Sequence, residues 1–263
     1  MAPPALTLSP SLALTPEPLT RDAFAPFGTA IIPPLPRTLT SAPNPLSTHP
    51  AHPLVPTPVA ANQLSALKYS PISPLLNNYS QCPSKQPSEA RMSMFSCFPR
   101  ALRTVDVDVA TGSEKGKKAV FDVGILERHP FTTQTFSPLG LDHHQGANER
   151  TYYLVIVAPT LKGQVASAMS ESGEKVSVRD PPDLSRLRVF VACGGDAVTY
   201  GAGTWHAPMV VVGERRVDFV VVQFVNGVAE EDCQEVCFGE GVVVDLGGVE
   251  GGKKEEEEVK SKL

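Results

Sequence analysis

The sequence has little of what secreted, thiolate-bound or membrane-spanning proteins need. Its 263 residues include five cysteines, at positions 82, 97, 193, 233 and 237. Their odd number and irregular spacing match neither a disulfide framework nor a four-thiolate zinc site, which favours a reducing compartment. No apolar run approaches the roughly 20 residues of a membrane helix, and the N-terminus lacks the basic segment of a secretory signal. We expect no membrane partner.

An excess of positive charge is also missing. The formal net charge is -5 and the pI is about 5.7. Proteins that bind nucleic acid by displacing counterions from phosphates carry clustered Lys and Arg, so no nucleic-acid partner is expected. The chain shows no internal repeat of solenoid length and no helical period longer than a few turns, which argues against repeat and helical-bundle folds.

Proline divides the chain, because 15 of its 26 prolines precede residue 59. Where prolines cluster they remove backbone donors and helical freedom. We expect residues 1–18 to be a disordered N-terminus and residues 33–58 to be a loop insertion. Between them, Thr20 is a candidate N-cap for a short helix that leads into an edge strand at Ala30–Ile32.

From about residue 90, short β-branched and aromatic runs bounded by Gly, Pro and Asp predict strands. The expected strands are Arg91–Phe98, Val120–His129, Thr132–Phe136, Tyr152–Ala158, Arg186–Ala192, Ala197–Tyr200, Met209–Val212 and Val217–Val225. Stretches 111–118 and 160–183 are rich in Gly, Ser and charge and are expected to be inserted surface loops. These features predict a single all-β domain over residues 19–245, an antiparallel β-barrel or sandwich with few short helices.

Candidate functional side chains follow from strand alternation within Val120–His129. Glu127 and His129 share one face with Phe121, Val123 and Ile125. If that face points into a barrel, the carboxylate and the imidazole need a partner, which is a metal, a substrate or each other. Gln134 is a third candidate facing inward.

A second cluster lies between Gly195 and Pro208. Glycines at 195, 201 and 203 allow a tight turn that delivers His206 at the start of a strand. The spacing resembles the second sequence motif of the cupin superfamily. Glu127-x-His129-x4-Gln134 resembles the first, with Glu127 in place of the usual first histidine and Gln134 in place of the usual glutamate.

At the family level the sequence resembles the ureidoglycolate lyases, over about residues 19–32 and 60–238. The segments that carry the resemblance are Phe24–Gly28, Leu126–Pro130, Thr133–Phe136, Pro182–Leu184, Arg188–Phe190, Tyr200–Pro208 and Asp218–Phe219. The resemblance implies a cupin-like, usually dimeric barrel that cleaves ureidoglycolate to glyoxylate and urea in allantoin breakdown.

On this resemblance, Glu127, His129, Gln134 and His206 are assigned as ligands of a divalent metal, arranged as cupin ligands are. Mixed N and O donors suit nickel or manganese, and no organic cofactor is expected. Catalytic roles fall to His206, Glu127, His129 and Tyr200. A metal-free site in which His206 or His129 is the base stays open, as do an ammonia-releasing amidohydrolase, another metal-dependent cupin activity and a non-catalytic cupin that binds a small anion.

Four residues are candidates for binding the substrate. Gln223 is placed to bind the urea amide, and Lys68 and Asn62 lie in a polar segment that the family has near its active site. Lys68 or Arg100 would hold the substrate carboxylate.

The C-terminus carries a targeting signal. Ser261, Lys262 and Leu263 form a tripeptide that a peroxisomal import receptor reads. Residues 246–263 form a charged segment that we expect to be flexible and to expose the signal. The expected location is the peroxisome, or the cytoplasm if the signal is not used.

Overall fold

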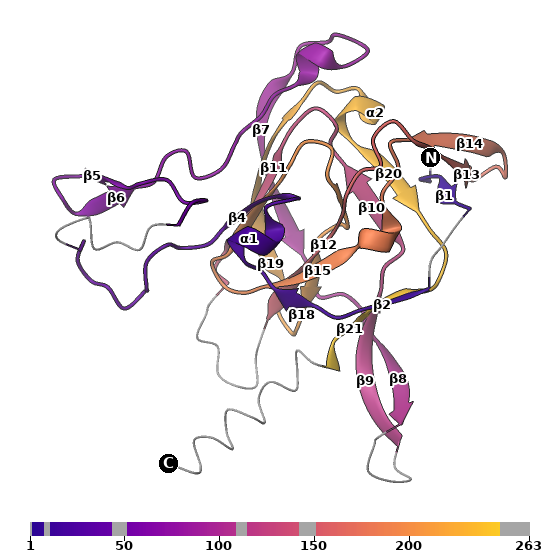
Figure 1. Cartoon of the computed structure of the whole chain (residues 1–263), viewed down its shortest axis with the longest axis horizontal. Helices are drawn as coiled ribbons and strands as arrows, with labels where there is room; N and C mark the ends of the chain where they lie inside the picture. Colours follow the sequence, from indigo (N-terminus) through magenta and orange to yellow (C-terminus); the bar gives the residue numbers. More distant parts are fainter. Residues whose placement is uncertain (1, 8–10, 44–51, 109–114, 142–150, 248–263) are drawn as a thin grey trace.

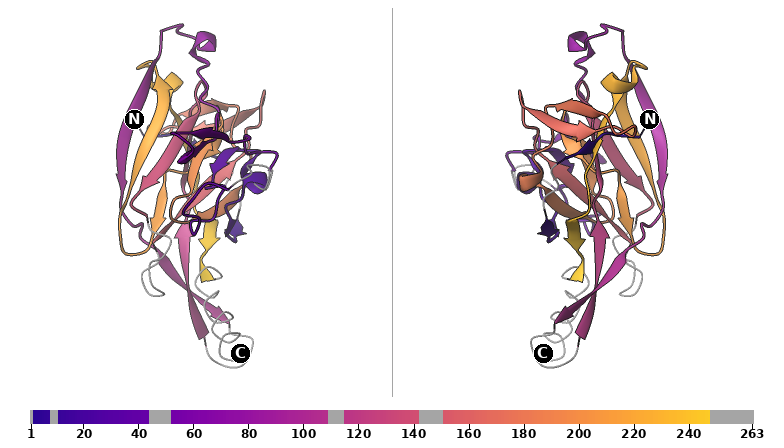
Figure 2. Two further views of the ribbon diagram at one scale, coloured as in Figure 1. Left: turned by 90° about the vertical axis from the view of Figure 1, so that its left-hand side faces the viewer. Right: turned by 90° about the vertical axis from the view of Figure 1, so that its right-hand side faces the viewer.

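The computed structural model describes residues 2–7, 11–43, 52–108, 115–141 and 151–247. Strands predominate in this part of the chain, and its α-helices are the short α1 (Arg21–Phe24) and α2 (Ala229–Asp232). Two large sheets pack face to face (Figures 1 and 2). The fold is therefore the expected all-β, cupin-like sandwich. No helix within the described ranges has the length and apolarity that crossing a membrane requires.

The first large sheet has the order β14-β13-β1-β20-β10-β17-β12-β15-β3, with β18 also paired to β12. Its strands are β14 (Lys175–Arg179), β13 (Val165–Met169), β1 (Ala5–Leu6), β20 (Gln234–Cys237), β10 (Ile125–Arg128), β17 (Trp205–His206), β12 (Tyr152–Ala158), β18 (Val210–Val212), β15 (Arg188–Ala192) and β3 (Glu17–Pro18).

The second large sheet has the order β4-β16-β11-β19-β7, and all of its pairs are antiparallel. Its strands are β4 (Gly28–Ile31), β16 (Ala197–Tyr200), β11 (Gln134–Leu139), β19 (Val217–Val225) and β7 (Glu89–Cys97). Among the described residues, β4 and β7 are the two edge strands of this sheet, and β19 lies between β7 and β11.

Two smaller sheets complete the described structure. One has the order β2-β21-β9-β8, formed by β2 (Leu12–Leu14), β21 (Val242–Asp245), β9 (Lys115–Asp122) and β8 (Arg103–Asp108). The other is the hairpin of β5 (Val59–Ala61) and β6 (Ala66–Lys68). Figure 1 shows this hairpin projecting well away from the two large sheets.

Strand β12 separates two apolar clusters, and all seven of its residues are buried. Tyr153, Val155 and Val157 belong to the cluster between the two large sheets, which also contains Phe136 and Phe219. The alternate residues of β12 belong to a cluster on the other face of the first sheet, together with Leu126 and Trp205. Because successive side chains point to opposite faces, a strand buried on both faces is apolar throughout.

Several expectations are confirmed. The strands at Tyr152–Ala158, Ala197–Tyr200 and Val217–Val225 have the predicted bounds. Thr20 caps α1, with its hydroxyl accepting a hydrogen bond from the backbone N–H of Ala23 at 3.2 Å. As predicted, the helix leads into β4, which is an edge strand of the second sheet.

The N-terminal expectation differs from the structure. Described residues within 1–18 form β1, β2 and β3 rather than a disordered segment. Strand β1 pairs with β13 and β20, and β3 occupies an edge position beside β15. Proline is compatible with sheet edges because no ladder hydrogen bond is required on the open side, so Pro18 can end β3. The proline-rich composition therefore predicted more disorder in residues 1–18 than their described part shows.

Two further differences concern loops and strand breaks. The expected surface loop at 160–183 contains the β13–β14 hairpin. Part of the expected loop at 111–118 belongs to β9. The predicted strand Val120–His129 is two strands, because the backbone of Val123 bonds to Val242 while Gly124 accepts from Phe238. The chain thus leaves the sheet of β9 and enters that of β10. The proposed tail from 248 onward lies outside the described residues.

Candidate active site

The site lies where β10 and β17 pair in the first large sheet. Glu127 stands directly opposite His206 in the antiparallel register, and β17 is held on its other side by β12. The Glu127 Oε1 and His206 Nε2 atoms lie 3.4 Å apart. With His129, these residues form a triad in which one potential ligand atom of each lies within 4.8 Å of the others. The structure thus brings Glu127 and His129 together. Phe121 and Val123, which were expected on the same face, instead belong to the cluster on the other face of the first sheet.

Backbone carbonyls orient both imidazoles of the triad. His129 Nδ1 lies 2.6 Å from the carbonyl oxygen of Asp232, and His206 Nδ1 lies 3.0 Å from that of Thr204. Because a carbonyl can only accept, each Nδ1 carries the proton that is donated. The remaining Nε2 atom of each ring is buried without a hydrogen-bond partner. Both Nε2 atoms therefore point into the site, and that of His206 faces Glu127.

The carboxyl of Glu127 is ionised at neutral pH. Burial alone would raise its pKa, but His206 and His129 outweigh burial and hold the pKa below its usual value. Burial lowers the pKa of His129, and His206 lowers it further. His129 is therefore neutral at pH 7. Glu127 retains 20% exposure of its side chain, against 1% for His206, so solvent and small solutes reach the site past the carboxylate.

This arrangement of acceptors suits a cation. A carboxylate oxygen and an imidazole lone pair that face each other at 3.4 Å repel unless a proton or a metal ion lies between them. Two imidazoles and one carboxylate are also a donor set that divalent transition metals accept. The residues of the triad thus fit the metal that the family resemblance implies.

Tyr200 and Gln134 border the triad on the second large sheet. The ring of Tyr200 stacks on His206 with centroids 3.8 Å apart and an interplanar angle of 11°. Burial raises the pKa of Tyr200, and Glu127 raises it further, so the phenol stays protonated. Gln134 is opposite Tyr200 in the register of β11 and β16. The stacking fixes the plane of the His206 ring.

Gln134 and Gln223 are joined on the same sheet. Gln134 Nε2 donates to Gln223 Oε1 at 2.6 Å. The carbonyl Oε1 of Gln134 is buried without a hydrogen-bond partner. An amide whose donor is occupied and whose acceptor is open can offer that oxygen to a metal or a substrate donor. Gln223 thus lies next to Gln134, and its binding of the urea amide stays a prediction.

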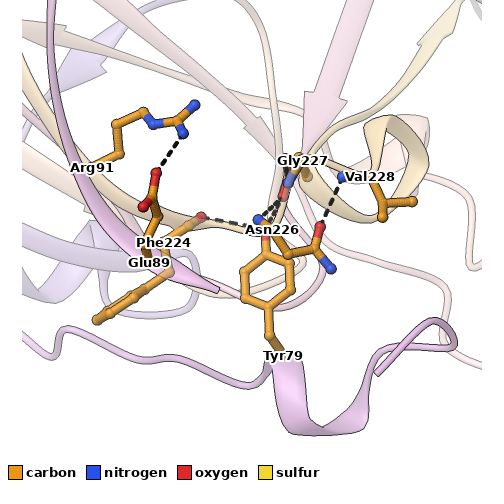
Figure 3. Close-up of polar contacts among 8 residues, drawn as sticks. Tyr79, Glu89, Arg91, Phe224, Asn226, Gly227 and Val228 are labelled. Atoms are coloured by element: carbon orange, nitrogen blue, oxygen red, sulfur yellow. Dashed lines mark hydrogen bonds and ion pairs between the residues drawn. The ribbon is translucent and has the colours of Figure 1, made fainter. Parts of the chain in front are cut away.

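A polar network around the side chain of Asp232 holds the carbonyl partner of His129 in place. Figure 3 shows three members of this network, Tyr79, Asn226 and Gly227. The carboxylate of Asp232 accepts the backbone N–H groups of Asn226 and Gly227, each at 2.8 Å. It also accepts the hydroxyl of Tyr79 at 2.6 Å. The helix α2, which ends at Asp232, is thereby tied to the 3-10 turn Tyr79–Gln81. These bonds fix the carbonyl that orients His129.

Sequence reasoning missed Asp232 and Tyr79. Asp232 is 103 residues from His129, and Tyr79 is 153 residues from Asp232. No local spacing connects them, and Asp232 acts on His129 through its backbone rather than through a side-chain type. Cys233, which follows Asp232 in the chain, was also not predicted to lie near Glu127. Burial and the charge of Glu127 raise the pKa of the Cys233 thiol to about 12. That thiol is therefore protonated and is a poor nucleophile.

The other candidates for substrate binding lie elsewhere. Asn62 and Lys68 are exposed on the projecting β5–β6 hairpin, with Asn62 in its turn. Figure 1 shows that hairpin far from β10. Arg100 is exposed, and its guanidinium lies 5.8 Å from the centroid of the Phe121 ring. Within this chain, the structure does not bring these three residues to the triad.

Comparison with known proteins identifies a family for this chain. A family profile described as ureidoglycolate lyase matches residues 11–245. The ureidoglycolate lyase of Schizosaccharomyces pombe is 34% identical over 176 residues, which cover 67% of this chain and 75% of that protein. The ureidoglycolate lyase of Saccharomyces cerevisiae is 37% identical over 188 residues, covering 70% and 80%.

A bacterial relative is similar over a shorter stretch. The ureidoglycolate lyase of Burkholderia mallei (strain NCTC 10229) is 35% identical over 102 residues, which cover 39% of this chain and 43% of that protein. The matched range spans the part of the chain that contains Glu127, His129 and His206. The chain belongs to the ureidoglycolate lyase family.

Proposed function

We propose that this protein is a ureidoglycolate lyase, a carbon-nitrogen lyase that cleaves ureidoglycolate to glyoxylate and urea. The observation that carries the proposal is the buried triad, in which an ionised Glu127 faces the open Nε2 atoms of two oriented histidines. The substrate has a hydroxyl and a urea nitrogen on one carbon. Cleavage requires a group that takes the hydroxyl proton and a group that protonates the departing nitrogen.

Glu127 can perform both proton transfers. Its carboxylate accepts the proton of the substrate hydroxyl, the carbon-oxygen double bond of glyoxylate forms, and the carbon-nitrogen bond breaks. The same proton then passes from Glu127 to the nitrogen that leaves as urea, so atoms and charge balance. The partial exposure of Glu127 lets the substrate approach it. Tyr200 and the carbonyl oxygens of Asp232 and Thr204 keep the two imidazoles in place.

A divalent metal, nickel or manganese, would be held by the Nε2 atoms of His129 and His206 and a carboxylate oxygen of Glu127. The open Oε1 of Gln134 supports its assignment as the fourth ligand. When bound, such an ion would lower the pKa of the substrate hydroxyl. We expect the purified wild-type protein to bind about one metal ion per chain, and His206→Ala to bind much less, as measured by elemental analysis after dialysis.

The catalytic assignment is tested by a pair of matched variants. Glu127→Gln keeps the shape of the side chain but removes the base, so we expect kcat to fall by about 10²- to 10⁴-fold, the usual contribution of general acid-base catalysis. Glu174→Gln is the control, because Glu174 is exposed between β13 and β14. An unchanged kcat in Glu127→Gln would overturn the assignment.

A homodimer is proposed as the assembly, supported by an apolar surface on the second large sheet. Met92 and Met94 on the edge strand β7 are 74% and 55% exposed, and they stand opposite Val222 and Val220 of β19. Contiguous exposed apolar surface at a sheet edge is typical of an interface between proteins. We expect sedimentation to give a dimer that Met92→Lys with Met94→Lys dissociates. Val165→Lys, on the exposed hairpin strand β13, is the control.

Peroxisomal import is a further proposal, and it rests on the C-terminal Ser261, Lys262 and Leu263 alone. These residues lie outside the described part of the structure. A fluorescent fusion at the N-terminus should reach peroxisomes when the tripeptide is intact. It should stay in the cytosol when residues 261–263 are deleted. Cytosolic fluorescence with the intact terminus would refute the proposal.

A further inference from the structure

The substrate of the proposed reaction is an anion, and the triad alone does not neutralise it. Ureidoglycolate carries a carboxylate, and the side chains of the triad are one carboxylate and two imidazoles. A guanidinium or ammonium group near the triad and Gln134 would pair with the substrate carboxylate. The residues expected for this role, Lys68 and Arg100, lie elsewhere in the chain, so the position of the cation is open.

The strand register of the second sheet leads from the triad to Arg91. Tyr200, which stacks on His206, is opposite Gln134. Gln134 donates to Gln223 at 2.6 Å, and Gln223 stands directly opposite Arg91 of β7. Directly opposed residues of an antiparallel pair point to the same face with their Cβ atoms about 5 Å apart. Arg91 therefore continues the polar row that begins at the triad.

Aromatic contacts show independently that this face of β7 points into the sandwich. Phe95, four residues after Arg91, stacks on Phe136 with ring centroids 5.7 Å apart. Phe136 is two residues after Gln134 and packs edge-on against Tyr200 at 6.0 Å. Side chains two and four residues apart in a strand share a face. Arg91, Gln134 and Tyr200 thus belong to the same inner surface.

Arg91 is available to a ligand, whereas two arginines buried more deeply are occupied. Its guanidinium bonds to Glu89 at 2.7 Å, in a pair whose side chains are 52% and 71% exposed. Exposed ion pairs contribute little to stability, so a substrate carboxylate can displace Glu89. Arg128 instead bonds to Gln234 and two backbone carbonyls. Arg188 is held by both carboxylate oxygens of Glu17 and by a backbone carbonyl.

We propose that Arg91 binds the carboxylate of the substrate, exchanging Glu89 for it, and that this contact selects 2-hydroxy acids with a ureido group over their neutral analogues. The inference rests on the proposed function. The planar guanidinium offers two parallel donors to a carboxylate, which fixes the direction of the substrate. Gln223 lies between Arg91 and Gln134, next to the bound carboxylate. Glu89 is the partner of the guanidinium before the substrate arrives.

The test compares steady-state kinetics of the full-length protein and three variants. The substrates are ureidoglycolate and its neutral amide, in which a carboxamide replaces the carboxylate. For Arg91→Gln we expect the KM for ureidoglycolate to rise about 10- to 100-fold, the range for loss of a charge-assisted pair. For the neutral amide, kcat/KM of Arg91→Gln should stay within about twofold of the wild-type value. The amide has no carboxylate for Arg91 to pair with, so at most one hydrogen bond is lost. Glu89→Gln should lower the KM for ureidoglycolate, because it removes the competing carboxylate.

Arg216→Gln is the matched control, because Arg216 forms an exposed pair with Asp218 at 3.1 Å. Its kinetics should equal those of the wild type. A KM for ureidoglycolate that is as low in Arg91→Gln as in Arg216→Gln would overturn the role of Arg91 while leaving the lyase activity intact. If the wild-type protein itself does not turn over ureidoglycolate, the proposed function fails, and the role of Arg91 fails with it.

Discussion

Tyr79→Phe removes one oxygen atom from the network behind His129, and its effect can be estimated from the structure. Tyr79 is 2% exposed, and its hydroxyl donates to Asp232 Oδ1 at 2.6 Å. Burial raises the pKa of Tyr79, and Asp232 raises it further, so the hydroxyl always carries the proton that it donates. Hydrogen bonds to charged groups contribute about 1.5–3 kcal/mol, and we expect a loss of about 2 kcal/mol in the free energy of unfolding.

The loss has a thermal and a catalytic readout. For a chain of this size, about 2 kcal/mol corresponds to a fall in Tm of about 4–8 °C. The carboxylate of Asp232 keeps its two backbone donors, so α2 should loosen without unfolding. The carbonyl that orients His129 then holds the ring less firmly. We expect kcat to fall by about tenfold, within the 10- to 100-fold range typical when the hydrogen-bonding partner of a metal-binding histidine is disturbed.

Tyr153→Phe is the control for stability alone. Its hydroxyl donates to the backbone carbonyl of Asp196 at 2.5 Å, and its ring packs in the core against Phe219. It should lower the Tm while leaving kcat near that of the wild type. If Tyr79→Phe and Tyr153→Phe lower stability but leave kcat equally unchanged, the network is structural only, and the argument that it positions His129 is refuted.

Two further predictions concern backbone packing and acid stability. Gly28→Ala should destabilise the protein by about 3 kcal/mol or more, the upper range for overpacking, because a Cβ at φ +151° would meet Thr199 O at 1.9 Å. Gly124→Ala meets nothing within 4 Å and should leave the urea midpoint within error of wild type; equal midpoints for the two variants would contradict the packing argument. Burial alone would raise the pKa of Glu231, but hydrogen bonds led by Ser84 lower it to about 2 from 4.5. A carboxyl whose pKa is lower in the folded than in the unfolded protein stabilises the fold at pH values above its unfolded pKa, and this stabilisation is lost as the pH falls. The wild-type protein should therefore have a higher urea midpoint than Glu231→Gln at pH 5, and the difference should shrink towards pH 2. A constant advantage across that range would refute this reasoning.

The fold was predictable where the sequence pattern is local. The run Tyr152–Ala158 is continuously apolar, and a strand buried on both faces has that composition. Prediction failed where partners distant in sequence decide the structure. The break at Val123–Gly124 depends on hydrogen bonds to residues 242 and 238. The short strands near the N-terminus exist because they pair with strands that come much later in the chain.

The site was predictable to the extent that strand alternation determines which way side chains point. Glu127 and His129 lie two residues apart in sequence, so they were assigned to one face, and the glycine-rich turn identified His206. The position of Arg91 on this inner surface was not predictable from the sequence. Arg91 reaches the inner surface only through its register with Gln223, and that register is a property of two strands more than 120 residues apart. Lys68, which has a suitable charge, belongs to a hairpin that projects elsewhere.

Product analysis of the wild-type protein tests the central claim most directly. The full-length chain is incubated with ureidoglycolate, with and without added nickel or manganese, and glyoxylate, urea and ammonia are measured in the same samples. The account predicts equal amounts of glyoxylate and urea, no ammonia, and loss of both products in Glu127→Gln. Ammonia in place of urea would identify an amidohydrolase, and turnover that survives in Glu127→Gln would contradict the proposed mechanism.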